Sequence, residues 1–197
     1  MIDISRKHPW SLNIDSICPS FLDNPAPHRL GAGNYWSIEV EFETLLDDYN
    51  IQNDIISLHP SSIGVFIYKN YTFLHLHQNN DGRSIFIDKQ VVSNSFFKLQ
   101  LSHYPNEKLE LKFQDEVIHT EPIDKIPLDT TGFRNMYIGS HTHDNIGASE
   151  EPALRIYRLK IKDDEGIVGE YDWSKDTYFD GRVMDLSGNN NILYEVE

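Results

Sequence analysis

The sequence predicts an all-β domain, a two-sheet antiparallel β-sandwich of jelly-roll type. Two observations support this prediction. From Tyr35 onward, short segments of alternating apolar and polar residues follow one another, with turn-forming residues between them at intervals of roughly 8–12 residues. No helical periodicity extends beyond about two turns, so the strands are expected to form two sheets that pack on each other.

The first 34 residues are predicted to form an irregular N-terminal arm that leads into the domain at residues 35–197. The stretch "NPAPHRLGAGN" contains two prolines and two glycines, which is typical of a loop. The other interpretation, an N-terminal strand followed by a long connection, is favoured over a separate module. Trp10, Leu12 and Ile14 are the apolar residues with which such an arm would contact a neighbouring protein.

The first strand of the domain is predicted within "SIEVEFET" at residues 37–44. Its apolar residues are expected on the buried face, and its three carboxylates, Glu39, Glu41 and Glu43, on the opposite face. The strands that follow are predicted in "IISLH", "SIGVFIYKN", "YTFLHLHQ", "RSIFID", "FFKLQLSHY", "KLELKFQ" and "EVIHT". Turns are predicted at Asn80-Asp81-Gly82, in "YPNEK" and in "FQDE".

The segment "ALRIYRLKI" breaks the alternation. Leu154 and Ile156 share one parity, whereas Tyr157, Leu159 and Ile161 share the other. One inserted residue near Ile156, a β-bulge, would return both sets to the core.

Charge and composition disfavour some classes of partner. The chain has 31 acidic and 17 basic residues and a formal charge of −14, so its surface repels phosphate backbones and anionic lipid. We therefore expect neither a nucleic acid partner nor membrane insertion. Cys18 is the only cysteine, which excludes an internal disulfide. The first residues lack the pattern of a secretory signal, so we expect synthesis in the cytoplasm without a signal peptide.

Several segments carry a family resemblance. They are the Ile138-Gly139 step, "IYRLKI" at 156–161, "YDWS" at 171–174 and "DLSGNNN" at 185–191. With "YWSIEVEFET", they resemble the laminin-G-like branch of the concanavalin A-like lectin/glucanase domains, over residues 34–197. The resemblance implies a concanavalin A-like jelly roll that recognises carbohydrate and often carries Ca²⁺. The "DLSGNNN" turn departs from many members, in which it stands near the start of the domain.

Two loops contain the residue types that bind sugars, namely aromatic rings and planar polar groups. The candidate ligand-binding residues are His141, His143, Asp144, Asn145, Asp176, Tyr178 and Phe179. Trp173, by contrast, is interpreted as a core residue because it follows Tyr171 on a predicted strand.

Metal binding is a second hypothesis, for some of these residues and for another pair of histidines. The pairs His75/His77 and His141/His143 would each present two imidazoles on one face of a strand. A Ca²⁺ site would use oxygen ligands instead, and its candidates are Asp144, Asn145, Asp185 and Asn189. From its residues alone, the "DLSGNNN" element is interpreted as a turn before the last strand, in which Asp185 accepts backbone N–H groups.

Glu39, Glu41 and Glu43 raise the hypothesis of glycoside hydrolysis. Some glucanases of the resembling fold use a Glu-x-Asp-x-Glu strand, and Glu41 here stands where that motif has Asp. Residues i and i+4 of a strand are about 13 Å apart. Retaining hydrolysis needs two carboxyl groups about 5–5.5 Å apart. We therefore favour the interpretation of an ordinary exposed strand face.

The sequence thus predicts a non-catalytic carbohydrate-binding or adhesion module that contacts a cell-surface glycan. A phage or other bacterial particle is the setting that we expect by analogy. One alternative is a structural decoration protein that binds only other proteins of the particle. The other alternative is a glycoside hydrolase that uses Glu39 and Glu43.

Overall fold

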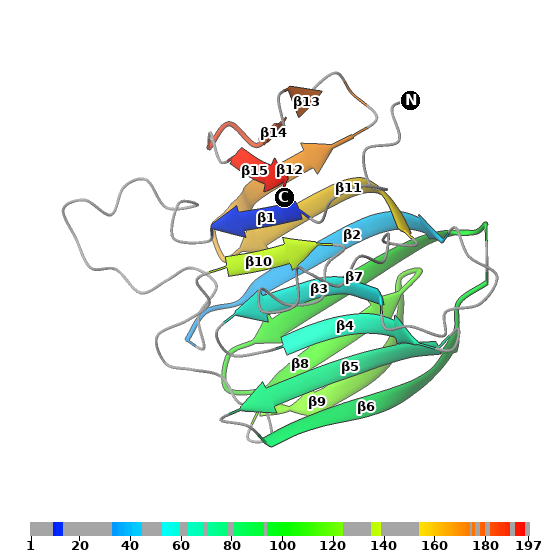
Figure 1. Ribbon diagram of the computed structural model, residues 1–197. Helices are drawn as coiled ribbons and strands as arrows, with labels where there is room; N and C mark the ends of the chain where they lie inside the picture. Colours follow the sequence, from blue (N-terminus) through cyan, green and yellow to red (C-terminus); the bar gives the residue numbers. More distant parts are fainter. Residues whose placement is uncertain are drawn as a thin grey trace.

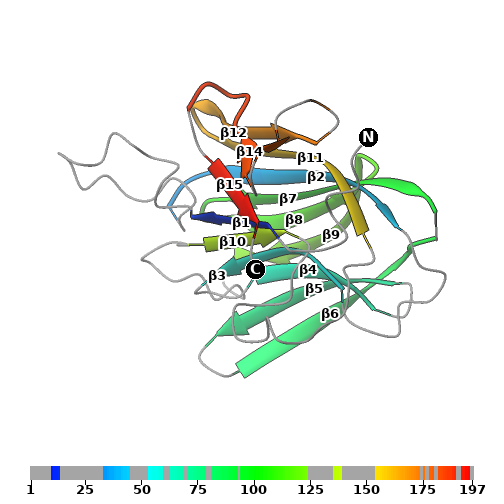
Figure 2. The same ribbon diagram turned by 45° about the horizontal axis from the view of Figure 1, so that its top comes forward.

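The computed structural model describes residues 10–13, 33–44, 53–59, 63–68, 71–78, 81–92, 94–123, 135–138, 154–173, 175, 178–179, 182–189 and 192–195. Its strands form two antiparallel sheets that lie one over the other (Figure 1, Figure 2). The predicted two-sheet antiparallel β-sandwich is therefore confirmed.

Within the described residues, one sheet has nine strands in the order β13-β14-β15-β1-β10-β3-β4-β5-β6. In chain order they are β1 (Trp10–Asn13), β3 (Asn53–His59), β4 (Ile63–Tyr68), β5 (Tyr71–Gln78), β6 (Asp81–Gln90), β10 (Asn135–Ile138), β13 (Tyr178–Phe179), β14 (Arg182–Met184) and β15 (Ile192–Glu195). The first and last strands of the chain are neighbours in this sheet, with Trp10 opposite Glu195.

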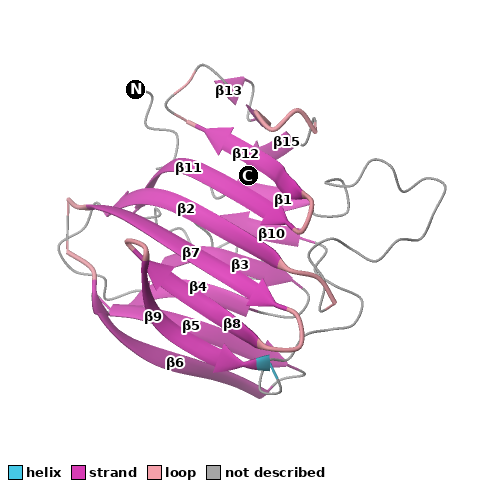
Figure 3. Cartoon of the chain, turned by 180° about the vertical axis from the view of Figure 1, so that it is seen from behind, coloured by secondary structure: helices cyan, strands magenta, loops and turns pink. Residues whose placement is uncertain are grey.

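The other sheet, as far as the chain is described, has six strands in the order β12-β11-β2-β7-β8-β9, and Figure 3 shows it in front. Its strands are β2 (Trp36–Thr44), β7 (Phe96–Tyr104), β8 (Lys108–Phe113), β9 (Glu116–Pro122), β11 (Leu154–Asp163) and β12 (Gly166–Asp172). β2 lies between β11 and β7, so the first predicted strand of the domain is an interior strand.

Residues 10–13 differ from the predicted irregular arm. They form β1, which pairs with β10 on one side and with β15 on the other. These four residues agree with the N-terminal strand of the other interpretation, and the connection after it lies largely outside the described residues. Ile14 and Cys18 lie outside the described residues.

The predicted turns fall between paired strands. Tyr104 pairs with Lys108 around a turn in which Asn106 has a φ of 62°. Gln114 and Asp115, with φ values of 51° and 68°, connect β8 to β9. The β5–β6 hairpin is also confirmed, but Gln78 pairs with Asp81, so Asp81 and Gly82 belong to β6 instead of the turn.

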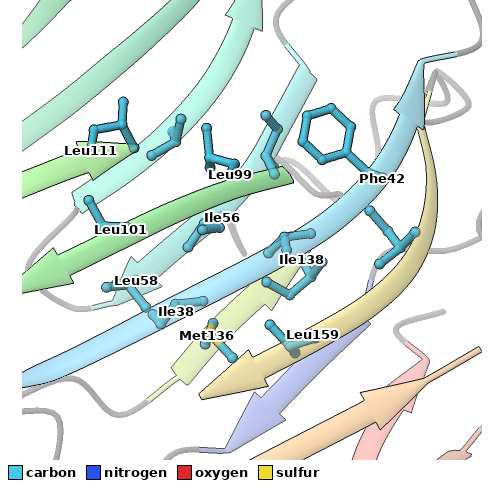
Figure 4. Close-up of a cluster of buried hydrophobic side chains, with 14 of the residues drawn as sticks. Ile38, Phe42, Ile56, Leu58, Leu99, Leu101, Leu111, Met136, Ile138 and Leu159 are labelled. Atoms are coloured by element: carbon cyan, nitrogen blue, oxygen red, sulfur yellow. The ribbon is translucent and has the colours of Figure 1, made fainter. Parts of the chain in front are cut away.

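A shared apolar core fills the space between the sheets (Figure 4). Ile38 and Phe42 of β2 are fully buried, as are Ile56 of β3 and Met136 and Ile138 of β10. Trp173 is buried as well, in agreement with its interpretation as a core residue. Burial of apolar surface on this scale is the main source of folding free energy.

The predicted β-bulge is confirmed. The register of β11 on β2 shifts between Ile156 and Arg158, so that Tyr157 is the extra residue. The bulge keeps the apolar residues on either side of it buried, and these are Leu154, Ile156, Leu159 and Ile161. The prediction that Tyr157 joins the core is wrong, since Tyr157 is half-buried and its hydroxyl group donates to Glu43. Glu43 lies on the outer face, because its strand neighbours Phe42 and Thr44 are buried.

One histidine is part of the buried layer. The His103 ring stacks on the Trp36 indole with centroids 5.2 Å apart and an angle of 17° between the planes. His103 Nδ1 lies 2.8 Å from the carbonyl oxygen of Asn34. Burial lowers the pKa of His103, although the hydrogen bond to Asn34 acts in the opposite direction.

Deletion of Tyr157 should be tolerated. Without it, Ile156 and Leu159 keep one parity in a regular strand, and the loss of the hydrogen bond from Trp173 N to Tyr157 O (3.0 Å) should cost about 0.5–1.5 kcal/mol. Deletion of Lys160, an outer-face residue of the same strand, turns Ile161 out of the core and should cost about 2–5 kcal/mol. Urea denaturation of both variants measures the difference, and equal losses would contradict the bulge.

His103 should make the protein less stable at mildly acidic pH. In the unfolded chain the His103 imidazole binds a proton near pH 6.5, whereas in the folded chain burial lowers its pKa. The free energy of unfolding should therefore be at its full value above about pH 6.5 and decrease as the pH falls below that value. Urea denaturation from about pH 7.5 to 5 should show the advantage of the wild type over His103→Gln shrinking as the pH falls. A constant difference between the two proteins would refute this assignment.

Candidate functional site

The outer face of the six-stranded sheet carries a regular charge pattern. The three glutamates of β2 alternate with buried apolar residues, and each lies opposite a basic residue of β11 in the register. The pairs are Glu39 with Lys160, Glu41 with Arg158 and Glu43 with Arg155. These carboxylates therefore lie on the face turned away from the core, and opposite charges on neighbouring strands attract each other.

Glu43 has the most direct contacts of the three. Its Oε2 accepts hydrogen bonds from Arg155 Nη1 at 2.6 Å and from the Tyr157 hydroxyl group at 2.9 Å. The side chains of Arg155 and Glu43 are 27% and 24% exposed, so the pair is accessible to a ligand.

Two aromatic rings adjoin this pair. Phe96, at the start of β7, lies opposite Glu43 in the register and is 50% exposed. Its ring centroid is 5.6 Å from that of Tyr157. Phe96, Tyr157, Glu43 and Arg155 together form what we call the aromatic–carboxylate cluster.

Local backbone structure holds the cluster in place. The bulge in β11 directs Tyr157 toward the outer face. Just before Phe96, Asn94 adopts a φ of 51°, and its N–H donates to the carbonyl oxygen of Thr44 at 2.9 Å. Gln114 Nε2 donates to the carbonyl oxygen of Phe96 at 2.9 Å. The ring of Phe96 therefore projects from a backbone that is hydrogen-bonded on both sides.

Polar residues continue along the outer face of β7. Lys98 Nζ lies 2.5 Å from Asp115 and 3.9 Å from Glu39, and the hydrogen bond to Asp115 is the main reason that the pKa of Lys98 is raised. Gln100 Nε2 donates to Ser102 Oγ at 2.9 Å. This part of the face presents an ammonium and an amide group, whereas Ser102 is fully buried.

A second aromatic group ends the strand. The ring centroids of Tyr104 and Tyr35 are 5.3 Å apart, and Lys108 Nζ lies 4.9 Å from the Tyr104 ring centroid. Lys108 also donates to Glu110 at 2.6 Å, and this hydrogen bond is the main reason that the pKa of Glu110 is lowered. We call Tyr35 and Tyr104 the tyrosine pair.

Arg158 and Lys160 of this face form ion pairs with Glu170. Arg158 donates to Glu170 of β12, and this contact is the main reason that the pKa of Glu170 is lowered. Lys160 lies 3.5 Å from the same carboxylate. The face thus offers donors, acceptors and ring faces side by side, which is the chemistry that recognises hydroxyl-rich ligands.

Most of the loop residues predicted to bind ligand lie outside the described residues. These are His141, His143, Asp144, Asn145 and Asp176. Tyr178 and Phe179 form β13, in which Tyr178 pairs with Val183. The ligand-binding role of all seven stays a prediction.

The Asp185 turn is fastened to β12. Asp185 Oδ1 accepts the N–H groups of Glu170 (2.9 Å) and Ser187 (2.8 Å), and Oδ2 accepts the Ser187 hydroxyl group at 2.7 Å. Asn189 Nδ2 donates to the carbonyl oxygen of Val168 at 3.2 Å. The predicted capping by Asp185 is confirmed. Within the part of the chain that is described, no group of three or more His, Cys, Asp or Glu side chains is placed to hold a metal ion, and the metal-binding role of Asp185 and Asn189 stays a prediction.

Sequence reasoning did not single out the members of the cluster other than Glu43. Two signals in the sequence pointed to them. Phe96 has the outer-face parity in "FFKLQL", where an aromatic residue is unusual, and Tyr157 stands at the break in "ALRIYRLKI". Their contact depends on the register of three strands, which the sequence alone does not specify.

Several solved structures share this fold at low sequence identity. A Bacteroides ovatus protein, provisionally described as a carbohydrate binding protein, matches 98% of this chain and 61% of its own, with a TM-score of 0.62 and 13% identity. Domains LG4-5 of the mouse laminin α1 chain match 83% of this chain and 40% of their own, with a TM-score of 0.51 and 9% identity.

The chain has the laminin-G-like jelly-roll fold. The CBM40 domain of Ruminococcus gnavus IT-sialidase, solved with α2,3-sialyllactose bound, matches 79% of this chain and 88% of its own, with a TM-score of 0.53 and 14% identity. The receptor-binding domain of botulinum neurotoxin C/D matches 82% of this chain with a TM-score of 0.53 and 14% identity, and the jelly roll spans only 40% of that domain.

Comparison of sequences adds no relative. No protein-family model matches the jelly roll, and no curated protein matches it significantly. In the described part of the chain, no helix has the length and apolar character needed to cross a membrane.

Replacement of Asp185 by Ala should destabilise the jelly roll. The change leaves the N–H groups of Glu170 and Ser187 without their carboxylate acceptor, and we expect the free energy of unfolding to fall by about 1–3 kcal/mol. Urea denaturation measures the loss, with Glu107→Ala in an exposed turn as the control. Equal stability of the two variants would show that the hydrogen bonds of Asp185 do not stabilise the fold.

The same variants test the predicted Ca²⁺ site. If Asp185 binds Ca²⁺, added Ca²⁺ should raise the Tm of the wild type, and Asp185→Ala should lose that increase. A wild-type Tm that is the same in Ca²⁺ and in EDTA would refute the metal prediction and would not affect the stabilising role of the Asp185 hydrogen bonds.

Proposed function

We propose that the protein is a non-catalytic carbohydrate-binding module and that its glycan contacts the aromatic–carboxylate cluster. The observation that carries the proposal is the exposed Phe96 ring beside the hydrogen-bonded Glu43–Arg155 pair. An aromatic face packs against the apolar face of a sugar ring. A carboxylate accepts, and a guanidinium donates, hydrogen bonds with the hydroxyl groups at the ring edge.

The shared fold supports the same function. The CBM40 domain binds α2,3-sialyllactose in its structure, and the Bacteroides ovatus protein is provisionally described as carbohydrate binding. Since one fold hosts many functions, the aromatic–carboxylate cluster carries the proposal and the shared fold adds support.

The geometry favours binding over hydrolysis. Glu39 and Glu43 are four residues apart on β2, which corresponds to about 13 Å along a strand. Glycosidases hold their two carboxyl groups about 5–9.5 Å apart. Glu43 is also engaged by Arg155 and Tyr157, as expected for a residue that orients hydroxyl groups.

As the biological setting, we propose a phage or other bacterial particle that uses this module to adhere to a cell-surface glycan. Synthesis in the cytoplasm agrees with the presence of a single cysteine, because the fold then needs no internal disulfide. Co-sedimentation of the protein with intact particles from an infected or induced culture tests the setting separately from the sugar.

A glycan array followed by calorimetry tests the binding function. We expect at least one glycan to bind with a Kd below millimolar and Phe96→Ala to weaken it about tenfold, the loss of roughly 1.4 kcal/mol of ring stacking. Glu43→Gln should also weaken binding, because the amide replaces one acceptor with a donor. Val117→Ala, which shortens an exposed apolar residue of the edge strand β9, is the control and should bind as the wild type does.

Two outcomes would count against the proposal. No glycan binding by folded wild-type protein would remove the carbohydrate function and favour a purely structural role in protein–protein contacts. Release of reducing sugar by the wild type, but not by Glu43→Gln, would show that the protein is a glycoside hydrolase.

A further inference from the structure

The two aromatic groups of the six-stranded sheet lie at opposite ends of one strand. Phe96 begins β7 and Tyr104 ends it, and both have the outer-face parity because Phe97, Leu99 and Leu101 between them are buried in the core. Phe96 has the ring of Tyr157 as its neighbour, and Tyr104 has the ring of Tyr35. The aromatic–carboxylate cluster and the tyrosine pair therefore flank the same stretch of sheet.

The distance between these groups sets the length of a ligand that touches both. Tyr104 is eight positions after Phe96, which is about 27 Å at a rise of about 3.4 Å per residue. One or two sugar rings do not cover that span, whereas an extended chain of several sugars does. A ligand seated on Phe96 alone would leave the tyrosine pair without a role.

The side chains between the rings suit hydroxyl groups. Lys98 and Gln100 lie partly exposed on the outer face of β7, with Glu39 on the adjacent strand β2. They supply an ammonium and an amide donor as well as amide and carboxylate acceptors. Sugar hydroxyls both donate and accept, so a mixed row of this kind matches them better than a row of one charge.

The charge of this face differs from that of the whole chain. The chain carries −14, whereas the outer faces of β2, β7, β8, β11 and β12 carry seven basic and six acidic side chains. The basic residues are Lys98, Lys108, Lys112, Arg155, Arg158, Lys160 and Lys162, and the acidic residues are Glu39, Glu41, Glu43, Glu110, Glu170 and Asp172. A nearly balanced face on an acidic protein attracts neither strong anions nor strong cations and suits an uncharged partner.

We propose that this face binds a linear, uncharged polysaccharide that runs along β7 from the aromatic–carboxylate cluster to the tyrosine pair. The proposal rests on the carbohydrate-binding function and specifies its substrate class and its mode of binding. The module contacts the interior of an extended chain, not a terminal sugar.

Calorimetry with oligosaccharide ladders tests the proposal. The probes are neutral β-glucan, xylan and galactan oligosaccharides of two to about eight units, with oligogalacturonides as the anionic comparison. We expect affinity for a neutral ladder to rise with length until the chain spans the strand and then to level off. We expect the oligogalacturonides to bind more weakly, because the acidic protein repels them.

Variants at the two ends show whether both contact the chain. Phe96→Ala and Tyr104→Ala should each weaken the longest ligand about tenfold. A ligand of two units contacts only one of the two aromatic groups, so one of the two substitutions should reduce its affinity much less than the other. Tyr104→Phe keeps the ring and should retain most of the affinity, and thermal melts confirm that each variant is folded.

The outcomes separate this inference from the function on which it rests. Glycan binding that is independent of chain length, or is unaffected by Tyr104→Ala, would overturn the extended site and leave the carbohydrate-binding function standing. A preference for the oligogalacturonides would overturn the uncharged substrate class. No binding to any ladder or to the glycan array would overturn both proposals.

Discussion

The apolar layer shared by the two sheets is the constraint on which the rest of the structure depends. Because successive side chains of a strand point to opposite faces, burial of Ile38, Val40 and Phe42 turns Glu39 and the other β2 glutamates outward. The basic residues of β11 are directed to the same face for the same reason. The composition of the outer face is therefore a direct consequence of how the core is packed.

The bulge at Tyr157 keeps the core packed and also places an aromatic side chain on the outer face. A regular strand would turn either Ile156 or Leu159 away from the core, and the extra residue avoids that loss. Its side chain is consequently directed to the outer face, where it contacts Glu43 and Phe96. Side chains held in this way lose little freedom when a ligand binds, which favours affinity.

The strands and the bulge were predictable because their signals are local. Alternation over six to ten residues is enough to place β7 or β8, and the break in parity is visible within β11 itself. The place of the N-terminal strand was not predictable in the same way, since the residues of β1 pair with β10 and β15, which are distant in the sequence. The contact of Phe96 with Tyr157 is equally non-local, because it depends on the registers of β11 with β2 and of β2 with β7.

Stability and recognition are carried by different faces of the same strands. Partly exposed ion pairs such as Arg155–Glu43 contribute only about 0–1 kcal/mol to folding, whereas one buried apolar side chain contributes about 1.5–3 kcal/mol. The polar groups of the outer face can therefore exchange their partners for the hydroxyl groups of a ligand at little cost to the fold. For the same reason, substitutions on this face should change which ligand is bound while the sandwich stays folded, so the core and the recognition surface can vary independently.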